Sequence, residues 1–243
     1  MTGLIRVFSG NLWLGRAEPE ALVELIRRFQ IDVFAAQELG HDCAEAISAE
    51  LPHGCLEPRE SYHGMGIAMR HPGSYERIQM AYRDARRVVL DPKDWNGLDR
   101  AVDLINVHFQ APHSMKPFPS ARVRHQQASA MEAYVAANPS DSRLVVGDYN
   151  ATPAWPLYQR MARMFEDGAI ASAKKAGRRP QPTWGRRPES RRLLRIDHAM
   201  VKGMEVEGFQ VIDIPGSDHS GILFDCAPAP VTEPVQDTDP IES

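Results

Sequence analysis

Cysteine is scarce in this 243-residue chain, and its placement suits neither of the usual cysteine chemistries. The three cysteines, Cys43, Cys55 and Cys226, are an odd number at distant positions with no Cys-x-x-Cys pair. Structural zinc sites and redox pairs need closely spaced cysteines, so the sequence argues against both. Unpaired thiols fit a reducing compartment, and we expect a cytoplasmic protein.

Long apolar runs and an export leader are also missing. No apolar segment approaches the roughly 20 residues that cross a bilayer, and the start MTGLIRVFSGNLW has neither a basic leader with an apolar run nor a small-residue cleavage site. The net charge of -4 argues against a protein that coats nucleic acid through bulk electrostatics. We expect no transmembrane segment, and we predict no protein partner.

The patterns that are present indicate an α/β protein. An apolar strand at residues 4–13 precedes an amphipathic helix at 18–29 and a second strand at 31–36. Further strands are expected at 66–69, 86–90, 101–108, 144–147, 196–202, 207–212 and 221–224, and further helices at 43–51, 121–137 and 157–165. Several strands follow one another without a helix between them, which favours mixed sheets over a purely parallel sheet.

One domain is expected, because no repeat and no Pro/Gly linker divides the chain. We assign residues 1–226 to it. The remaining stretch, 227–243, is rich in proline and acidic residues and poor in bulky apolar ones. It is predicted to be a disordered tail.

Polar side chains lie at the ends of several predicted strands. They are Asn11, Glu38, His108, Asp148 with Asn150, Asp197, and the pair Asp218 and His219 before the last strand. Taken singly, each has a structural explanation, as a turn or cap residue, a helix-start carboxylate, a core histidine or an Asx turn. Ligands collect at strand ends in layered α/β folds, so their convergence favours a functional site.

Together these residue types suit metal-assisted hydrolysis of a phosphate ester. That reaction needs a hard cation on oxygen ligands, a base for water, and donors for charge developing on phosphorus. The candidates are Glu38 and Asp218 as ligands, Asp148 as base, Asn11 and Asn150 as neutral positioning groups, and two histidines as donors. Mg²⁺ is the expected cofactor, with Mn²⁺ as a substitute.

The motifs NLW, QE, VH, GDYN, RIDH and SDH, in that order, resemble the endonuclease/exonuclease/phosphatase superfamily, whose members include DNase I. The resemblance covers roughly residues 5–224. It implies a four-layer α/β sandwich, in which two mixed β-sheets pack face to face with helices outside. It also implies a metal-dependent phosphoesterase.

Where the family's motifs match this sequence, the resemblance implies roles for the polar residues. It implies that Glu38 binds the essential metal with Asn11 and Asp218 nearby, and that Asp148 orients or deprotonates water. It further implies that Asn150 holds the phosphate or the nucleophile, that Asp197 orients His219 against a phosphoryl oxygen, and that His108 is a second active-site histidine. The partner of that histidine is unassigned between Glu60 and His63.

A basic stretch precedes the strand that carries Asp197. Residues 174–195 contain nine Lys or Arg residues and Trp184. An aromatic ring among arginines can stack on a base while guanidinium groups hold phosphates, so we expect Trp184, Arg186 and Arg187 to bind substrate. In the helix that follows His108, Arg124 is a further candidate. A solvated loop is the alternative for the basic stretch.

Three functions fit these patterns. The first is a Mg²⁺-dependent phosphodiesterase acting on nucleic acid, and the second is a phosphatase or phosphodiesterase acting on a lipid or small-molecule phosphate. The third is a silent binding protein on the same fold, which we disfavour because Glu38, Asp148 and His219 are all retained. We expect the first, a nuclease-like enzyme with a phosphate-ester substrate.

Overall fold

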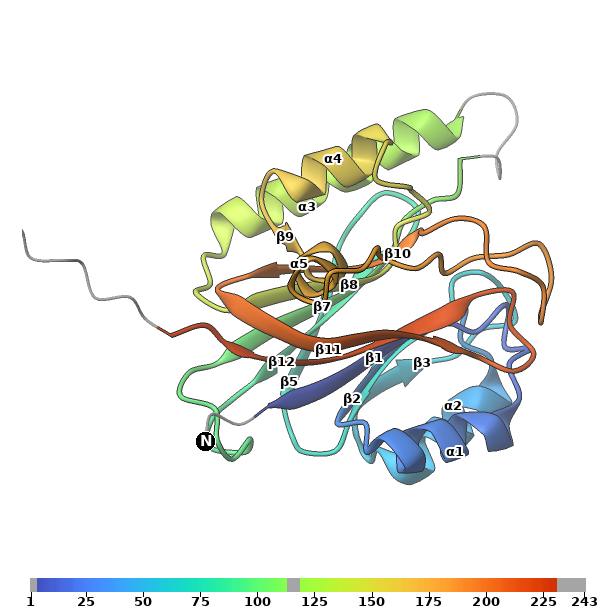
Figure 1. The fold of residues 1–243 in the computed structure, drawn as a ribbon, viewed down its shortest axis with the longest axis horizontal. Coiled ribbons are helices and arrows are strands. Elements are labelled where there is room, and N and C mark those ends of the chain that lie inside the picture. The colour runs from blue at the N-terminus through green and yellow to red at the C-terminus, as the bar shows by residue number, and fades with distance from the viewer. Residues whose placement is uncertain (1–3, 113–118, 231–243) are drawn as a thin grey trace, which may run out of the picture.

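Two six-stranded mixed sheets form the frame of the structure, a computed structural model that describes residues 4–112 and 119–230 (Figure 1). The first sheet has the order β11 (Met204–Asp213), β12 (Ser220–Pro228), β1 (Ile5–Asn11), β2 (Val33–Gln37), β4 (Met65–Met69), β3 (His53–Glu57). The second has the order β5 (Ser74–Ile78), β6 (Ala85–Leu90), β7 (Val102–His108), β8 (Arg143–Asp148), β10 (Asp197–Lys202), β9 (Glu166–Asp167).

The outer faces of the two sheets are covered by α1 (Pro19–Phe29), α2 (His41–Glu50), α3 (Pro119–Ala137) and α4 (Pro156–Ala162). The short α5 (Gly168–Lys175) instead packs against β10 and β11, which belong to different sheets. Figure 1 shows α1 and α2 on one side of the sandwich and α3 and α4 on the other. Three hydrophobic clusters fill the spaces between these layers: one between the two sheets, and one between each sheet and its helices. This is the four-layer sandwich that the resemblance implied.

The helix α1 illustrates how local sequence sets an element. Pro19 stands at its first turn, where the missing N–H costs nothing. Leu22, Leu25 and Ile26 then recur at helical spacing and are buried. The helix ends at Gln30, which adopts a left-handed conformation with φ 50°. The apolar stripe therefore faces the first sheet.

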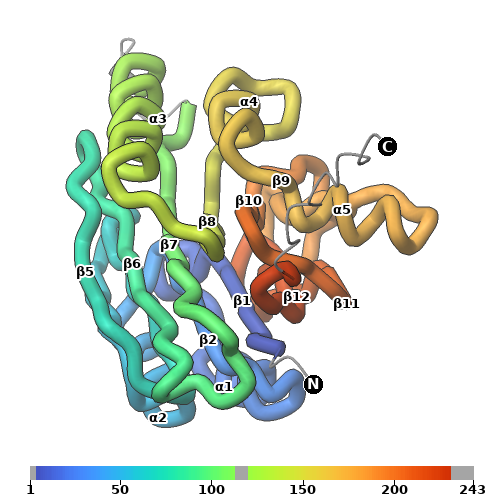
Figure 2. Tube along the Cα trace, turned by 90° about the vertical axis from the view of Figure 1, so that its left-hand side faces the viewer, coloured from blue at the N-terminus to red at the C-terminus, as the bar shows by residue number. Residues whose placement is uncertain are grey.

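Each sheet contains one parallel strand pair, and these two pairs prepare the site. β1 runs parallel to β2, and β7 runs parallel to β8, whereas the other paired strands run antiparallel. Figure 2 shows the two sheets edge-on, with β1 and β2 lying beside β7 and β8. The carboxyl ends of a parallel pair lie at the same sheet edge, so side chains placed there come together.

The sequence-based elements differ from the observed ones mainly at the sheet edges. All the expected strands and helices are present, but β3, β5, β9 and α5 were not predicted. β3 and β5 are edge strands with largely exposed side chains, and they lack a buried apolar alternation. The predicted helix at 157–165 ends at Ala162. The basic stretch is a loop only in part, because α5 extends through Lys175.

The C-terminal boundary also differs from the expected one. β12 extends through Pro228, so the first two residues of the proposed tail belong to the sheet. Residues 231–243 lie outside the described residues, and the disordered tail stays a prediction. Within the described ranges, none of the helices has the length and apolar character needed to cross a bilayer.

Candidate active site

Four strand ends from the two sheets deliver the polar side chains to one place. Asn11 ends β1 in register with Gln37, which ends β2 and precedes Glu38. In the other sheet His108 and Asp148 end β7 and β8 in register with each other. Asp197, at the start of β10, pairs with Asp148 across the antiparallel ladder. The strand ends that the sequence singled out are thus neighbours in the fold.

The backbone at these strand ends is unusual. Gly147 has φ 135°, and a Cβ there would lie 1.9 Å from the carbonyl oxygen of Val107, so only glycine fits before Asp148. Glu38 and Asn150 adopt left-handed conformations with φ 51° and 46°. Asn tolerates that region, but Glu rarely occupies it. Such strain persists where the surrounding structure enforces it, and it is common at functional sites.

Asp148 lies at the centre of the cluster. Its Oδ2 accepts hydrogen bonds from Asn11 Nδ2 at 3.1 Å and from Asn150 Nδ2 at 3.0 Å, while Oδ1 accepts from the Asn150 N–H at 2.7 Å. Oδ2 also lies 3.4 Å from His108 Nε2. Burial raises the pKa of Asp148 to about 7, although the nearby His219 opposes the shift. The group can therefore exchange a proton near neutral pH.

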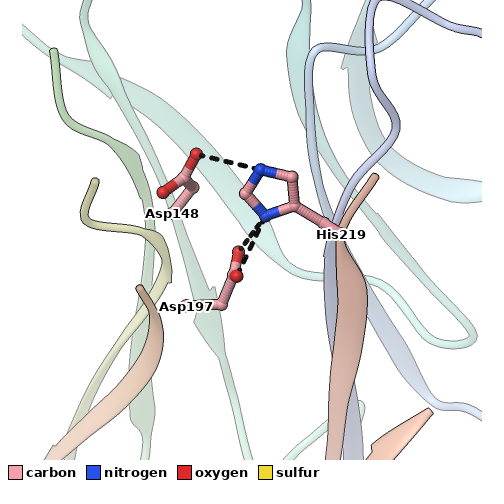
Figure 3. Close-up of side chains that lie close together, drawn as sticks. All are labelled: Asp148, Asp197 and His219. Atoms are coloured by element: carbon pink, nitrogen blue, oxygen red, sulfur yellow. Dashed lines mark hydrogen bonds and ion pairs between the residues drawn. The ribbon is translucent and has the colours of Figure 1, made fainter. Parts of the chain in front are cut away.

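His219 and Asp197 form a buried ion pair beside it (Figure 3). Nδ1 of His219 lies 3.0 Å from Asp197 Oδ2, and Nε2 lies 3.9 Å from Asp148 Oδ2. Burial lowers the pKa of His219, but the Asp197 carboxylate outweighs it and raises that pKa to about 10. The imidazole is therefore cationic at neutral pH.

Glu38 lies on the side of the first sheet. Its Oε1 accepts from Asn11 Nδ2 at 3.0 Å, and its Oε2 accepts from the Leu14 N–H at 3.0 Å. Asn11 thus links Glu38 in one sheet to Asp148 in the other. Burial raises the pKa of Glu38, while the hydrogen bond from Asn11 opposes the shift. A carboxylate held at this depth suits a bound cation.

His108 is fully enclosed between the two carboxylates. Nε2 lies 3.4 Å from Asp148 and 3.7 Å from Glu38. Burial lowers its pKa well below the ordinary value, and nearby Arg83 adds to the shift, so this histidine is neutral. Nδ1 has no hydrogen-bond partner among the described residues. Neither Glu60 nor His63, the partners weighed from sequence, makes a described hydrogen bond or ion pair with it.

Asp218 is held by the residues around it. Its Oδ2 accepts from Trp184 Nε1 at 3.0 Å, while Oδ1 is buried without a partner in the described chain. Arg192 steadies the same turn, because its side chain donates to Ser220 Oγ at 2.7 Å and to the carbonyl oxygen of Asp218 at 2.9 Å. Arg192 was seen in the sequence only as part of a basic stretch. Its partners in that turn lie 25 or more residues along the chain, so no local pattern could identify them.

Arg83 is a site residue that the sequence reasoning missed. It is buried against the cluster, and its Nη1 donates to the carbonyl oxygen of His108 at 3.0 Å. Its Nε has no partner within the described part of the chain. Burial lowers the pKa of Arg83, and the carboxylates of Glu38 and Asp148 oppose the shift. A buried guanidinium facing a phosphate site can bind phosphoryl oxygens.

A cavity of about 520 Å³ opens over the cluster. Its polar floor is formed by Glu38, Arg83, His108, Asp148, Asn150, Asp218 and His219, and its walls include Trp13, Tyr62, Tyr82, Trp155, Trp184 and Leu194. This volume lies within the roughly 300–1,000 Å³ typical of small-molecule sites.

The sequence profile of the Endonuclease/Exonuclease/phosphatase family matches residues 8–219. The chain belongs to this family. No curated protein matches the chain.

Solved structures of the same fold cover nearly the whole of this family member. The human Nocturnin catalytic domain with bound sulfate is 19% identical with a TM-score of 0.69, and the match covers 94% of this chain and 96% of that one. A Beutenbergia cavernae endonuclease/exonuclease/phosphatase is 17% identical with a TM-score of 0.69, over 93% and 72% of the two chains. A Bacteroides thetaiotaomicron mannosyl-6-phosphatase is 15% identical with a TM-score of 0.65, over 92% and 99%. At these identities the likeness establishes the fold.

Two sets of residues in this endonuclease/exonuclease/phosphatase family chain could hold a metal. Asp148, Asp197 and His219 bring ligand atoms within 4.8 Å of one another. The other set is Glu38 with Asn11 and Asp218. Its donors are oxygens, and one of them, Asp218 Oδ1, is buried without a partner among the described residues. Carboxylate and amide oxygens are the ligands that a hard cation prefers.

The substrate-binding candidates lie in different surroundings. Trp184 lines the cavity. Arg124 is buried behind its wall, where its Nη1 donates to the carbonyl of Gln110 and its guanidinium lies 5.7 Å from the ring centre of Trp155. Arg186 and Arg187 are exposed and are not among the residues that line the cavity. Their role in substrate binding stays a prediction.

Proposed function

We propose that this protein is a metal-dependent phosphodiesterase of the nuclease type, which hydrolyses a phosphodiester bond by in-line attack of water. The observation that supports it is the position of Asp148 Oδ2. This single buried oxygen lies within 4 Å of two amide donors and two histidines, which come from both sheets. Such preorganised polar groups are the main source of catalysis in phosphoryl transfer.

Asp148 takes the proton of the attacking water in this proposal. The water oxygen forms a bond to phosphorus, one water proton passes to Asp148, and the bond from phosphorus to the leaving oxygen breaks with its electron pair. The leaving oxygen takes a proton from solvent. A pKa of about 7 suits a general base at neutral pH. Asn150, bonded to the same carboxylate, orients the water or the phosphate.

The cationic groups then stabilise the charge that develops on the phosphoryl oxygens. His219 carries a positive charge that is fixed by Asp197, and its Nε2 points toward Asp148 (Figure 3). Arg83 adds a second buried cation at the floor of the cavity. Both are already desolvated, so little reorganisation is needed in the transition state.

Glu38, Asn11 and Asp218 would hold a divalent cation, which we propose to be Mg²⁺ with Mn²⁺ as a substitute. When bound, the ion supplies charge neutralisation at the phosphate and lowers the pKa of water. The oxygen-rich donor set and the unpartnered Asp218 Oδ1 support this assignment. We also propose a cytoplasmic location, since the three cysteines are free in the structure.

A phosphatase or phosphodiesterase acting on a small-molecule phosphate is the second candidate. The concave cavity of about 520 Å³ favours it, because a flat nucleic-acid surface would not need such a pocket. One solved structure of the same fold is named a mannosyl-6-phosphatase.

A substrate panel tests the proposal. Single- and double-stranded DNA, RNA, abasic DNA, phospholipids and small phosphomonoesters are assayed with Mg²⁺, and Asp148→Asn serves as the inactive control. We expect phosphodiester hydrolysis that Asp148→Asn lowers by roughly 10²–10⁴-fold, the usual contribution of a general base. Full activity in that variant would refute the assignment of the base.

The metal assignment is tested with the same substrate. EDTA should abolish turnover, and Mg²⁺ or Mn²⁺ should restore it. The variant Glu38→Gln should need more Mg²⁺ for half-maximal activity, whereas Glu60→Gln, a carboxylate away from the cavity lining, should not. Rescue by zinc alone would contradict the oxygen-ligand interpretation.

A further inference from the structure

The cavity over the catalytic cluster is rich in aromatic side chains. Of the four tryptophans in the sequence, Trp13, Trp155 and Trp184 line it, and only Trp95 belongs to the core between the sheets. Two tyrosines, Tyr62 and Tyr82, complete the aromatic wall, by which we mean these five cavity-lining rings. Tryptophan is costly to expose, so concentrating three of them at one opening points to a ligand with apolar faces.

The rings of the aromatic wall come from separate loops. Trp13 follows β1, Tyr62 follows β3, Tyr82 precedes β6, Trp155 precedes α4 and Trp184 precedes β10. Tyr62 and Tyr82 retain 55% and 48% of their surface exposed, and the three tryptophans are partly exposed. Trp155 also packs against the core cluster between the second sheet and its helices, but none of the five rings is fully buried. They keep exposed surface at the opening of the cavity.

An arginine side chain lies close to three of the five rings. Arg16 lies 4.6 Å from the ring centre of Trp13, Arg83 lies 5.8 Å from that of Tyr82, and Arg124 lies 5.7 Å from that of Trp155. An aromatic cage for a cationic headgroup needs ring faces free of competing positive charge. Guanidinium groups at these rings repel such a headgroup, whereas they favour a neutral flat ring attached to a phosphate.

We infer that the aromatic wall is a subsite for the base of one unpaired nucleotide, held beside the scissile phosphate. The inference rests on the proposed phosphodiesterase function and names its substrate class. In a duplex the bases are stacked and their faces are covered, so a base must leave the stack before it can contact these rings. The enzyme therefore acts on single strands or short nucleotide esters in preference to duplexes.

Matched substrates test the inference. A short single-stranded oligonucleotide is compared with the same strand in duplex form and with a strand whose bases are replaced by abasic tetrahydrofuran units. We expect the single strand to have the lowest KM, and loss of the stacked base to raise KM by roughly 5- to 150-fold, the range given by base stacking on an aromatic ring. Equal KM values for the intact and abasic strands, or a preference for duplex, would overturn the subsite.

Variants of the aromatic wall provide a second test of the subsite. Trp155→Ala and Tyr82→Ala should raise KM for the intact strand much more than they lower kcat, and they should leave KM for the abasic strand unchanged. Trp155→Phe, which keeps a stacking face, should retain most of the affinity. Leu193→Ala is the control, since Leu193 is 53% exposed and lies outside the cavity lining. A loss of thermal stability in Trp155→Ala without a change of KM would show that the ring is structural.

A binding measurement separates failure of the inference from failure of the proposed function. Adenosine 5′-monophosphate and ribose 5-phosphate are titrated in Mg²⁺ while intrinsic tryptophan fluorescence is followed. We expect the nucleotide to quench the fluorescence and to bind at least fivefold more tightly than the sugar phosphate. If no phosphodiester is hydrolysed but this difference holds, the subsite stands and the reaction is wrong. Equal binding of both ligands overturns the subsite even if hydrolysis is found.

Discussion

The two ends of the β7–β8 pair carry buried ionisable side chains in the same register, yet the surroundings of these side chains differ. At the amino ends Asp103 faces Arg143, and at the carboxyl ends His108 faces Asp148. Asp103 receives Arg143 Nε at 2.6 Å on one oxygen and Arg87 Nε at 2.6 Å on the other, so both oxygens are paired with cations. At the other end His108 is neutral, and Asp148 has the cationic His219 at 3.9 Å together with neighbouring carboxylates and amides.

The comparison shows where the sheet is stabilised and where it is prepared for chemistry. A buried carboxylate with two guanidinium partners has its desolvation compensated. For Asp148, the cationic His219 at 3.9 Å compensates burial only in part, and burial and the nearby carboxylates of Asp197 and Glu38 raise the pKa. Groups whose burial is incompletely compensated are typical of catalytic sites, where stability is lost in favour of reactivity.

The largest expected effect on stability comes from the amino end. Asp103→Ala leaves Arg143 buried without its carboxylate and should lower the free energy of unfolding by roughly 3–5 kcal/mol. Asp148→Asn removes a buried charge whose desolvation is only partly compensated, and it should leave that free energy unchanged or raise it. Urea unfolding of both variants measures the difference. Equal losses would contradict the contrast between the two ends.

A smaller effect is expected from the arginine that steadies the catalytic end. Arg192→Ala frees the turn that carries Asp218 and His219, and should lower kcat by roughly 10–100-fold, as is usual for groups that orient active-site residues. Arg191→Ala is the matched control, because Arg191 is the exposed neighbour in the chain and does not line the cavity. Steady-state kinetics of both variants test this. A larger fall of kcat in Arg191→Ala would show that the basic loop, rather than the turn, is the important part.

The smallest effect concerns a second fully paired carboxylate, Asp167, in the edge strand β9. It accepts from Tyr158 Oη at 2.6 Å and Arg195 Nη1 at 2.7 Å, and it caps α5 through the N–H of Ala169 at 2.9 Å. Burial raises the pKa of Asp167, but His198, Arg195 and Tyr158 outweigh it and hold that pKa well below its usual range.

This shift predicts a dependence of stability on pH. The folded state has the lower pKa, so the stabilisation is complete above the unfolded value of about 3.9 and is lost as pH falls toward the folded value. The free energy of unfolding of the wild type should therefore fall, relative to that of Asp167→Asn, by at most about 1.4 kcal/mol per pH unit below pH 4. Asn keeps the helix cap, so the comparison isolates the charge. Parallel pH profiles for the two proteins would refute the assignment.

Much of the fold could be predicted because apolar periodicity is local. The amphipathic pattern of α1 and the apolar run of β8 predict their elements without knowledge of the rest of the chain. The edge strands β3 and β5 gave no such signal, because most of their side chains are exposed or half-buried, and their formation depends on the strands they pair with. α5 was not predicted because its small residues give little helical apolar pattern and its end overlaps the basic stretch.

The sequence by itself determined which residue types stand at the strand ends, from Asn11 to His219, since a buried apolar run followed by a polar group can be read locally. Only the tertiary structure decided what those groups do to one another. It placed Asn11 between Glu38 and Asp148, added Arg83 to the floor of the cavity, and placed three tryptophans at its opening. Proton affinity depends on burial and on charges a few ångströms away. Such short distances join residues far apart in the chain, as Asn11 and Asp148, 137 positions apart, show.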